Sequence, residues 1–467
     1  MIPSRLAALF AGAALLSACA AGPDYQVPTA GAAETGPFVA AAEGPFVAGQ
    51  APDDWWRLYE DPLLDDLVAQ ALSANRDIAV AAANLAQVRA ALGEARAGFL
   101  PSTTTTAGAA RVRQQDLATG AYQEGDSFQA GFEAAYELDV FGRVRRSVEA
   151  ARADAGAAEA QLDSARVTVA AETARAYADL CAANLQIATA RQTLDLQQET
   201  ADITGVQFEL GRGAGLDVAR AQTELESTRA TLPPLEAQRD SALFRLAVLT
   251  GRPPAEAPIA AAACQVVPEV TTAIPVGDGA ALLARRPDVR AAERRLAAAT
   301  ARIGVATASL YPSVTLGGGV STLGAEASDL GDEYQFNVGP LISWSFPNIL
   351  AARSRISQAG AGADAALPSF EQVTLVALQE TETALTQYAK ALERRAALQR
   401  ATDQGARAAR LSRMRYEAGV DSFLGVLDAE RTLAGLKAQL AQSQAQVADA
   451  QIVLFKALGG GWSQAGA

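Results

Sequence analysis

Residues 128–140 read FQAGFEAAYELDV, and apolar side chains recur there at every second position. This period of two, with polar or small residues between, is typical of a β-strand with one apolar face. A second such run covers residues 336–346, a weaker one covers 314–320, and a Thr-rich fourth covers 102–113. Each is about ten residues long, which is the length of a tilted strand that crosses a bilayer.

Period alone does not distinguish membrane-facing strands from half-buried strands of a soluble sheet. Beyond its first residues the sequence has no apolar run of the length that a membrane-spanning helix needs, and it begins like a lipoprotein, so context favours the membrane. Four strands cannot close a barrel in lipid, where unpaired strand edges are excluded. The chain is therefore expected to pool strands with copies of itself: two copies give about eight strands and three give about twelve, and the count alone allows either.

The sequence outside these runs is duplicated and helical. Two halves align at a spacing of about 208 residues, so that Phe128 matches Phe336 and Gly211 matches Gly419. Each half reads helix, two strands, long helix, tight turn, helix. Apolar residues recur every seven positions in 64–92 and in 426–454, which predicts coiled-coil packing. The predicted fold class is α+β, internally duplicated, with four strands and long coiled-coil helices in each chain.

The longest helix is predicted at residues 143–207, which contain no proline. Further helices are predicted at residues 63–98, 216–250, 287–309 and 351–415. Pro368 predicts a bend or break in the last of these, because proline removes a backbone hydrogen bond. The loop-rich stretch 251–284 is expected to form a belt beside the long helices.

The N-terminus carries a secretion signal. Arg5 supplies a short positive region, and an apolar core follows it. The sequence Leu-Ser-Ala-Cys that ends at Cys19 resembles a bacterial lipobox, which predicts cleavage before Cys19 and its lipidation; an ordinary signal peptide with a chance cysteine is the alternative. Ala20, where aspartate would mark retention in the inner membrane, favours the outer membrane. Cys181 and Cys264 are either paired in the oxidising periplasm or free and buried.

Composition excludes several classes of function. The chain has a net charge of -13 and no histidine. An acidic surface argues against nucleic-acid binding, and the lack of histidine excludes a His-based catalytic or metal site. The sequence shows no nucleophile–base pair, phosphate-binding loop or metal-ligand cluster, so neither an enzyme nor a cofactor is predicted.

Several segments carry a resemblance to a known family: Cys19 to Pro28, Trp55 to Leu63, Arg285 to Glu293, and the turns at 211–218 and 419–428. Together, in order and on a duplicated chain, they resemble the outer-membrane factor family, which includes TolC and the lipid-anchored drug-efflux channels. The resemblance implies a homotrimer with a twelve-stranded barrel among the lipids of the outer membrane and a long α-helical tunnel in the periplasm.

The resemblance also implies partners and a function. The tunnel would receive a periplasmic adaptor, or membrane fusion protein, linked to an inner-membrane pump of the resistance-nodulation-division type. The chain would be the channel subunit of a tripartite efflux system that exports drugs or other toxic compounds, lipid-anchored in the outer membrane with a periplasmic extension. A periplasmic adaptor or a structural coiled-coil envelope lipoprotein is the alternative, although adaptors lack spanning-length strands and a complete duplication.

The expected domain organisation follows from the repeat. The parts are a signal peptide at 1–18, a lipidated extended segment at 19–61, the first repeat at 62–254, a belt linker at 255–284, the second repeat at 285–458 and a tail at 459–467. The Trp55–Trp56 pair is expected to anchor against the belt. Asp61 is predicted to start a helix. The run from Arg285 to Asp288 is predicted to cap a helix and to form ion pairs at the belt.

The two turns between helices are the predicted functional sites. The expected tip and adaptor-contact residues are Gly211, Leu216, Asp217, Val218, Gly419, Phe423, Leu424, Val426 and Leu427. Asp428 matches the second acidic position of the family's Leu-Leu-Asp-Val-Leu-Asp aperture, whereas Gly425 departs from the first. Three copies of Asp428 would form an acidic ring. Apolar closure by Leu424 or Leu427 is the alternative, and a purely structural role as helix ends is compatible with both.

Overall fold

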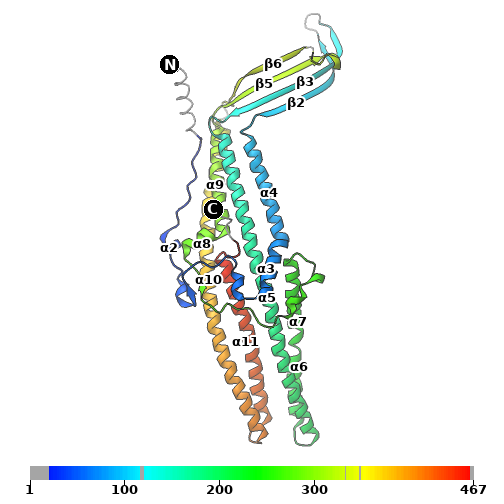
Figure 1. Cartoon of the computed structure of the whole chain (residues 1–467), viewed down its shortest axis with the longest axis vertical. Coiled ribbons are helices and arrows are strands. Elements are labelled where there is room, and N and C mark those ends of the chain that lie inside the picture. Colours follow the sequence, from blue (N-terminus) through cyan, green and yellow to red (C-terminus); the bar gives the residue numbers. More distant parts are fainter. Residues whose placement is uncertain (1–19, 116–119, 332, 347–348, 463–467) are drawn as a thin grey trace. The chain divides into compact units, whose positions relative to one another are not determined.

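The computed structural model describes residues 20–115, 120–331, 333–346 and 349–462, so that Cys19 and the signal peptide lie outside the described residues. The chain divides into two compact units, whose elements are labelled in Figure 1. Unit 1 comprises Met1–Thr29, Asn84–Glu159 and Ala291–Glu371; unit 2 comprises Ala30–Ala83, Ala160–Arg290 and Gln372–Ala467. Each unit takes residues from both sequence repeats.

Unit 1 contains the four predicted strands as one antiparallel sheet. They are β2 (Ser102–Gln115), β3 (Tyr122–Leu138), β5 (Ser313–Gly324, followed by the short 3-10 helix η5, Ala327–Asp329) and β6 (Tyr334–Ser343). The order is β2-β3-β5-β6, so each repeat supplies one hairpin, and β3 pairs with β5 across the repeats. The first and last strands are edges within the chain.

The sheet has one apolar face, and that face is exposed. Phe132 lies opposite Val320, which lies opposite Phe336, so the three side chains form a row on one face. Their exposed fractions are 46%, 42% and 74%. The next row on the same face ends in Val338, which is 79% exposed. The period of two seen in the sequence therefore corresponds to an apolar surface that the chain does not cover.

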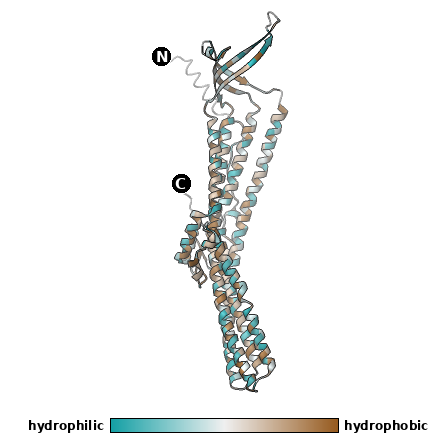
Figure 2. Cartoon of the chain, turned by 90° about the vertical axis from the view of Figure 1, so that its right-hand side faces the viewer, coloured by the Kyte–Doolittle hydropathy of each residue, from teal (hydrophilic) through white to brown (hydrophobic). Residues whose placement is uncertain are grey.

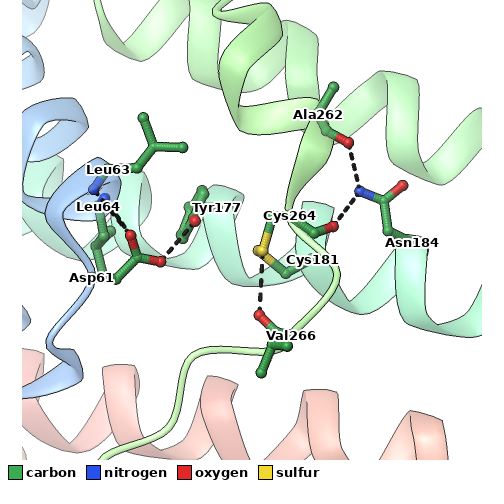
Figure 3. The surroundings of a disulfide bond; sticks show 9 residues. All are labelled: Asp61, Leu63, Leu64, Tyr177, Cys181, Asn184, Ala262, Cys264 and Val266. Atoms are coloured by element: carbon green, nitrogen blue, oxygen red, sulfur yellow. Dashed lines mark hydrogen bonds between the residues drawn. A yellow bond between two sulfur atoms is a disulfide. The ribbon is translucent and has the colours of Figure 1, made fainter.

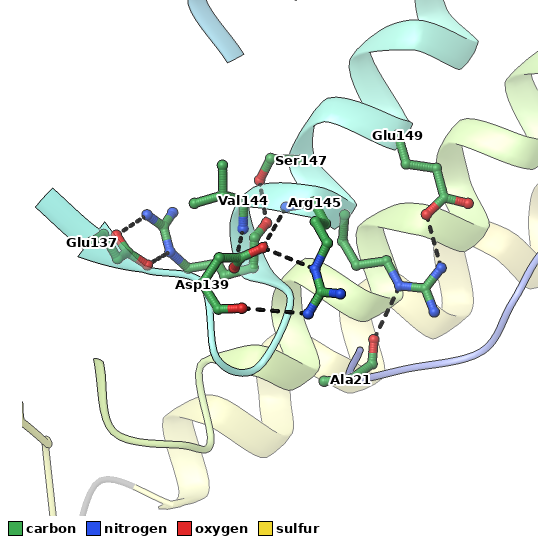
Figure 4. A network of polar contacts seen from close by, with 9 residues as sticks. Ala21, Glu137, Asp139, Val144, Arg145, Ser147 and Glu149 are labelled. Atoms are coloured by element: carbon green, nitrogen blue, oxygen red, sulfur yellow. Dashed lines mark hydrogen bonds and ion pairs between the residues drawn. The ribbon is translucent and has the colours of Figure 1, made fainter. Parts of the chain in front are cut away.

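The long helices start and end close to their predicted bounds. Helix α5 spans Arg143–Glu209, α9 spans Pro287–Ala308, and α10 spans Ile349–Glu417. The carboxylate of Asp139 accepts hydrogen bonds from the backbone N–H groups of Val144 and Arg145 and so satisfies donors in the first turn of α5 (Figure 4). Among the described residues, no helix combines the length and the apolar character that crossing a membrane requires.

Two predicted single helices are each divided in two. The stretch 63–98 forms α3 (Pro62–Ala74) and α4 (Arg76–Ala97), and the stretch 216–250 forms α6 (Gly215–Arg229) and α7 (Leu232–Leu249). At the first division the side chain of Asn75 accepts from the N–H groups of Asp77 and Ile78 and donates to the carbonyl of Leu249. Asn75 therefore caps α4 while it fastens the chain to the end of α7.

Of the bend or break predicted at Pro368, the break is not found, because α10 continues through the proline. Proline removes the donor that would bond to the carbonyl four residues earlier, at Asp364. Both Asp364 and Pro368 are exposed, so water can hydrate that carbonyl and the loss of one hydrogen bond does not end a helix of 69 residues. The last helix of the described residues is α11 (Phe423–Ala457).

Unit 2 combines helices with short elements around an apolar core. The N-terminal short elements are α2 (Ala32–Thr35), η1 (Ala40–Glu43), β1 (Phe46–Val47) and η2 (Trp55–Tyr59). Those of the belt are η3 (Pro254–Glu256), η4 (Ile259–Ala263), β4 (Ile274–Pro275), which pairs with β1 in parallel, and α8 (Gly279–Arg285). Trp55 is fully buried in this core with belt residues such as Val270 and stacks on Phe455 at a centroid distance of 4.9 Å. The expected anchoring role of Trp55 is confirmed.

The polar residues predicted at the helix starts act as expected. Asp61 Oδ1 accepts from the N–H groups of Leu63 and Leu64 and begins α3. Arg286 binds Asp288 at 2.6 Å and Glu380 at 2.7 Å, and it donates to the carbonyl of Ala457. Burial of Asp288 opposes its ionisation, but the Arg286 guanidinium outweighs this effect and lowers the pKa of the Asp288 carboxyl.

Cys181 and Cys264, which the sequence leaves either paired or free, form a disulfide bond (Figure 3). The bond joins α5 to the belt, and their Cα atoms lie 5.1 Å apart. One turn further along α5, the side-chain amide of Asn184 donates to the carbonyls of Ala262 and Cys264. The belt is thus fastened to α5 by one covalent bond and two hydrogen bonds at the same place.

Candidate functional site at the two hairpin turns

Two helical hairpins, α5–α6 and α10–α11, make their turns at the same end of unit 2 (Figure 1). Figure 2 shows polar and apolar residues interspersed along these helices. All nine predicted contact residues, together with Asp428, lie in or beside the two turns. The structure therefore brings together two segments that are about 208 residues apart in the sequence.

The first turn depends on the backbone conformation of Gly211. Its φ is +73°, a value that glycine adopts without strain from a side chain. The N–H of Gly211 donates to the carbonyl of Phe208, and the N–H of Arg212 donates to that of Gln207, which is the Schellman pattern of a helix end. Helix α6 then begins at Gly215.

Beyond the first turn, side chains lie at the surface. Leu216 is 60% exposed, while Asp217 and Val218 are half-buried. Asp217 lies in the first turn of α6, where a negative charge interacts favourably with the helix dipole, and it faces Arg220 at 3.8 Å. The first turn therefore presents an apolar side chain beside a partly screened acidic one.

The second turn repeats the backbone of the first. Gly419 also has a φ of +73°, and the N–H groups of Gly419 and Val420 donate to the carbonyls of Tyr416 and Arg415, at the equivalent positions. The side chains differ, because here Arg415 makes two hydrogen bonds, of 2.6 and 3.0 Å, with Asp421. These hydrogen bonds lower the pKa of the Asp421 carboxyl. The two turns therefore share their backbone, and the second has an ion pair at positions where the first has none.

Three of the predicted contact residues lie in the interior. Phe423, Val426 and Leu427 are 9%, 3% and 3% exposed. Phe423 and Leu427 belong to a small apolar cluster that also contains Ala221 and Leu225 of the first hairpin. These side chains hold the two hairpins together, and they are not available at the surface of the chain.

Polar contacts join the hairpins around this cluster. The hydroxyl of Tyr416 donates to Gln207 at 2.7 Å, and the guanidinium of Arg431 donates to Glu224 at 3.0 Å. Glu430 accepts from Arg413 of its own hairpin and from Thr200 of the other. Both hairpins are therefore connected by apolar and polar contacts.

The remaining predicted residues are accessible. Leu424 is 51% exposed, one position after the buried Phe423. Asp428 is exposed, and within the described part of the chain its carboxylate makes no hydrogen bond or ion pair. Gly425 leaves an open position between them, since a Cβ there would meet only Ser412 Oγ, at 3.7 Å. The start of α11 thus presents one apolar and one acidic side chain.

A set of exposed apolar residues lies beside the turns and is not among the residues predicted from the sequence. Ile203 and Val206 of α5 are 48% and 55% exposed, and the equivalent residues of α10, Leu411 and Met414, are 48% and 56% exposed. The signal was present in the seven-residue spacing of Leu196, Ile203 and Leu210. A cavity of about 710 Å³ also lies between α5, α6, α7 and α11, lined mainly by small and polar side chains.

The two hairpin turns offer surfaces for contact with other molecules and do not form a catalytic centre. Within the described residues, no group of three or more Cys, Asp or Glu side chains is placed to hold a metal ion. The site consists of exposed leucines, carboxylates and glycine turns, which suits contact with another protein or with a passing solute and does not suit bond chemistry.

Comparisons with known proteins identify the architecture. The sequence profile described as "Outer membrane efflux protein" matches residues 67–252 and 280–460. The chain is 31% identical over 460 residues to the toluene efflux pump outer membrane protein TtgF of Pseudomonas putida, with 96% of this chain and 95% of the relative covered. It is 32% identical over 462 residues to the outer membrane protein OprJ of Pseudomonas aeruginosa, with 96% and 94% covered.

Solved structures agree with this match. The outer-membrane channel OprN is similar with a TM-score of 0.90 and 38% identity, over 95% of this chain and 100% of that one. The open state of the MtrE outer membrane channel of Neisseria gonorrhoeae is similar with a TM-score of 0.82 and 28% identity, over 95% and 98% of the two chains.

Proposed function

The chain belongs to the outer membrane efflux protein family, and from this premise we propose that three copies form a channel through which a pump partner exports small toxic molecules from the periplasm. It is an efflux channel protein of the outer membrane and not an enzyme. Membership of this family favours the channel over the periplasmic adaptor and the structural coiled coil that the sequence left open.

The exposed apolar face of an open-edged sheet supports the proposal that copies of the chain associate through their strands, and the family resemblance supports three copies. The chain leaves the row Phe132, Val320 and Phe336 uncovered, and β2 and β6 have no further strand beside them among the described residues. In lipid, such edges must be paired, and the apolar face is the one that hydrocarbon solvates. Three chains with four strands each would pair edge to edge as about twelve strands.

The exposed parts of the two turns are the proposed docking surface for a periplasmic adaptor. Gly211, Leu216, Asp217 and Val218 of the first turn and Gly419 and Leu424 of the second remain accessible or half-buried. Phe423, Val426 and Leu427, which the resemblance also suggested, would support this surface from within. The adaptor would connect the channel to an inner-membrane pump of the resistance-nodulation-division type.

Asp428 is the proposed aperture residue, since its carboxylate is exposed and has no partner within the described part of the chain. Three copies around an axis would attract cations into the channel mouth. Of the two leucines considered for apolar closure, Leu427 is buried and Leu424 is exposed, so Leu424 is the better candidate.

The proposal also covers the N-terminus and the domain order. We infer that residues 1–18 are removed and that Cys19, which lies outside the described residues, is lipidated. The repeats at 62–254 and 285–458, with the belt linker at 255–284 between them, would each supply one strand pair and one helical hairpin. The segment 19–61 would carry the anchor, and 459–467 would be a short tail.

Native mass in detergent tests the trimer. The protein is extracted from purified outer membranes, and the particle mass is measured by native mass spectrometry. Three protomers per particle are expected. A monomer recovered from the soluble periplasmic fraction would contradict the channel, because four strands alone cannot form a closed sheet in lipid.

A further inference from the structure

A cavity of about 320 Å³ lies in unit 1 at the base of the sheet. Its wall comes from the end of β3, the start of α5, the connection between α9 and β5, the end of β6 and the first turns of α10. Three of the connections between the sheet and the helices, β3–α5, α9–β5 and β6–α10, therefore meet around one space.

The wall of this cavity carries two carboxylates, Glu137 and Asp139, and two guanidinium groups, Arg143 and Arg355. Glu137 is bound by Arg143 through hydrogen bonds of 2.8 and 2.5 Å, and Asp139 is bound by Arg145 at 3.2 Å, as Figure 4 shows around the start of α5. Each carboxylate on the wall thus has its own guanidinium partner. Arg355, which reaches the wall from α10, makes no ion pair or hydrogen bond to the described residues. Because Asp139 is paired with Arg145, which is not part of the wall, Arg355 is left on the wall without a carboxylate partner, and such a guanidinium suits an anion.

Aromatic side chains stand at the edge of the cavity. Trp344 is 56% exposed and donates its indole N–H to the carbonyl of Leu310 at 3.2 Å. Phe346 is 64% exposed and lies 5.1 Å from Trp344 between ring centroids. Tyr311 is 45% exposed and stacks on Phe141. Exposed aromatic rings with a hydrogen-bonding end are typical of the boundary between lipid and water.

The N-terminal segment reaches the same corner of unit 1. The N–H of Ala21 donates to the carbonyl of Phe141 at 3.0 Å, and the buried guanidinium of Arg146 donates to the carbonyl of Ala21 and to Asp24. Arg146 also binds Glu149, which fixes its orientation (Figure 4). Cys19 precedes Ala20 in the chain, so acyl chains attached there would start within two residues of this fixed point.

We propose that this cavity binds the headgroup phosphate of a phospholipid from the periplasmic leaflet of the outer membrane. Arg355 is the phosphate's partner, since a guanidinium offers paired donors that match phosphate oxygens. Trp344 and Phe346 lie against the start of the acyl chains. The inference rests on the proposed function, because it requires the sheet to lie in the membrane.

The test compares two arginines of one helix. Arg355→Ala removes the unpaired guanidinium of the wall; Arg353→Ala removes an equally exposed arginine that is not part of the wall. Each full-length protein is extracted in detergent, stripped of lipid and titrated with phosphatidylglycerol, and bound lipid is counted by native mass spectrometry. Arg355→Ala should weaken binding about tenfold, the loss expected for one charge-assisted hydrogen-bond partner, and Arg353→Ala should leave it unchanged.

Three outcomes separate the explanations. Equal affinities of the two variants would overturn the inference. Displacement of phosphatidylglycerol by an equal concentration of inorganic phosphate would also overturn it, because the site would then recognise phosphate without the lipid. The same spectra report the number of protomers: a particle that is not a trimer would contradict the proposed function, whereas a trimer with equal affinities would contradict only the lipid site.

Discussion

The two hairpin turns share one backbone and differ in what they place around it. Gly211 and Gly419 have the same φ of +73° and the same pair of hydrogen bonds, at positions 208 residues apart. Four positions after each glycine the chain has Gly215 in the first turn and Phe423 in the second. Phe423 packs against the first hairpin. Gly215 has no side chain, so it makes no equivalent contact with the second hairpin.

This difference gives the two turns different structural roles. The second turn supplies the side chains that hold the hairpins together, and the Arg415–Asp421 pair braces it. The first turn has Gln207 and Gly213 at the positions of that pair, and its apolar residues Phe208 and Leu216 are 51% and 60% exposed. The second turn therefore supports the first, and both turns expose apolar side chains, since Val420 and Leu424 of the second are 64% and 51% exposed.

The largest predicted effect is that of Phe423→Ala. The ring is 9% exposed and fills the cluster between the hairpins, so its removal should reduce the free energy of unfolding by about 3 kcal/mol. Hydrogen exchange measured by mass spectrometry should show faster exchange in both turns, because both lose their shared contact.

Leu216→Ala is the matched control from the first turn. An exposed leucine should change the free energy of unfolding by less than about 0.5 kcal/mol. If the two substitutions had equal effects on hydrogen exchange, the supporting role of the second turn would be wrong.

The turn glycines should behave alike. A Cβ added at Gly211 or at Gly419 would meet no atom within 4 Å, so only the left-handed backbone opposes a side chain. Gly211→Ala and Gly419→Ala should each cost about 1 kcal/mol in unfolding experiments. Gly251→Ala should cost more, because its Cβ would lie 2.5 Å from the carbonyl oxygen of Ala74. A cost confined to one of the two turns would show that their backbones are not equivalent in solution.

The ion pair of the second turn should make that turn sensitive to acid. The pKa of Asp421 is lowered in the folded protein by hydrogen bonds from Arg415, so the pair stabilises the turn above the ordinary aspartate pKa and is lost as the pH falls through the lowered value. Pepsin cleavage at the second turn, measured relative to the first, should rise as the pH falls below the ordinary aspartate pKa of about 4.

Asp421→Asn provides the control for this titration. The variant should show a cleavage ratio that does not depend on pH, since its turn has no carboxylate to protonate. A ratio that rises equally in both proteins would assign the acid sensitivity to another group.

The smallest predicted change concerns charge at the channel mouth. Asp428 occupies the position equivalent to Arg220, and Arg220 already faces Asp217. Asp428→Asn should reduce the cation preference of channels reconstituted in planar bilayers, and Arg220→Gln should alter it less because that charge is partly compensated. Unchanged ion selectivity of the Asp428 variant would remove this residue from the aperture.

Local patterns predicted most of the elements, and tertiary contacts decided the rest. The heptad from Leu64 to Leu92 predicted buried positions correctly, because each of its five members is at most 9% exposed. The division of that stretch at Asn75 was missed because it depends on the carbonyl of Leu249, 174 residues away. Pro233 and Pro234, at the start of α7, are a local signal for the other division.

The sequence predicts where the site residues lie in the chain, but it does not predict which of their side chains are exposed. Glycine spacing located both turns, because a left-handed helix end depends on nearby residues alone. Whether Phe423 or Leu424 faces solvent depends on how the second hairpin rotates against the first, which no local pattern specifies. The pairing of Cys181 with Cys264 likewise required the path of the belt across α5.

Photo-crosslinking at the turns tests the central claim most directly. A photoreactive phenylalanine analogue replaces Leu216, Leu424 or, as a control, Val248 of α7, which is as exposed as Leu216 at 60%. The channel is expressed with a periplasmic adaptor and irradiated in cells. We expect crosslinks to the adaptor from positions 216 and 424 and none from 248. Crosslinks from 248 alone, or from all three positions equally, would contradict docking at the turns.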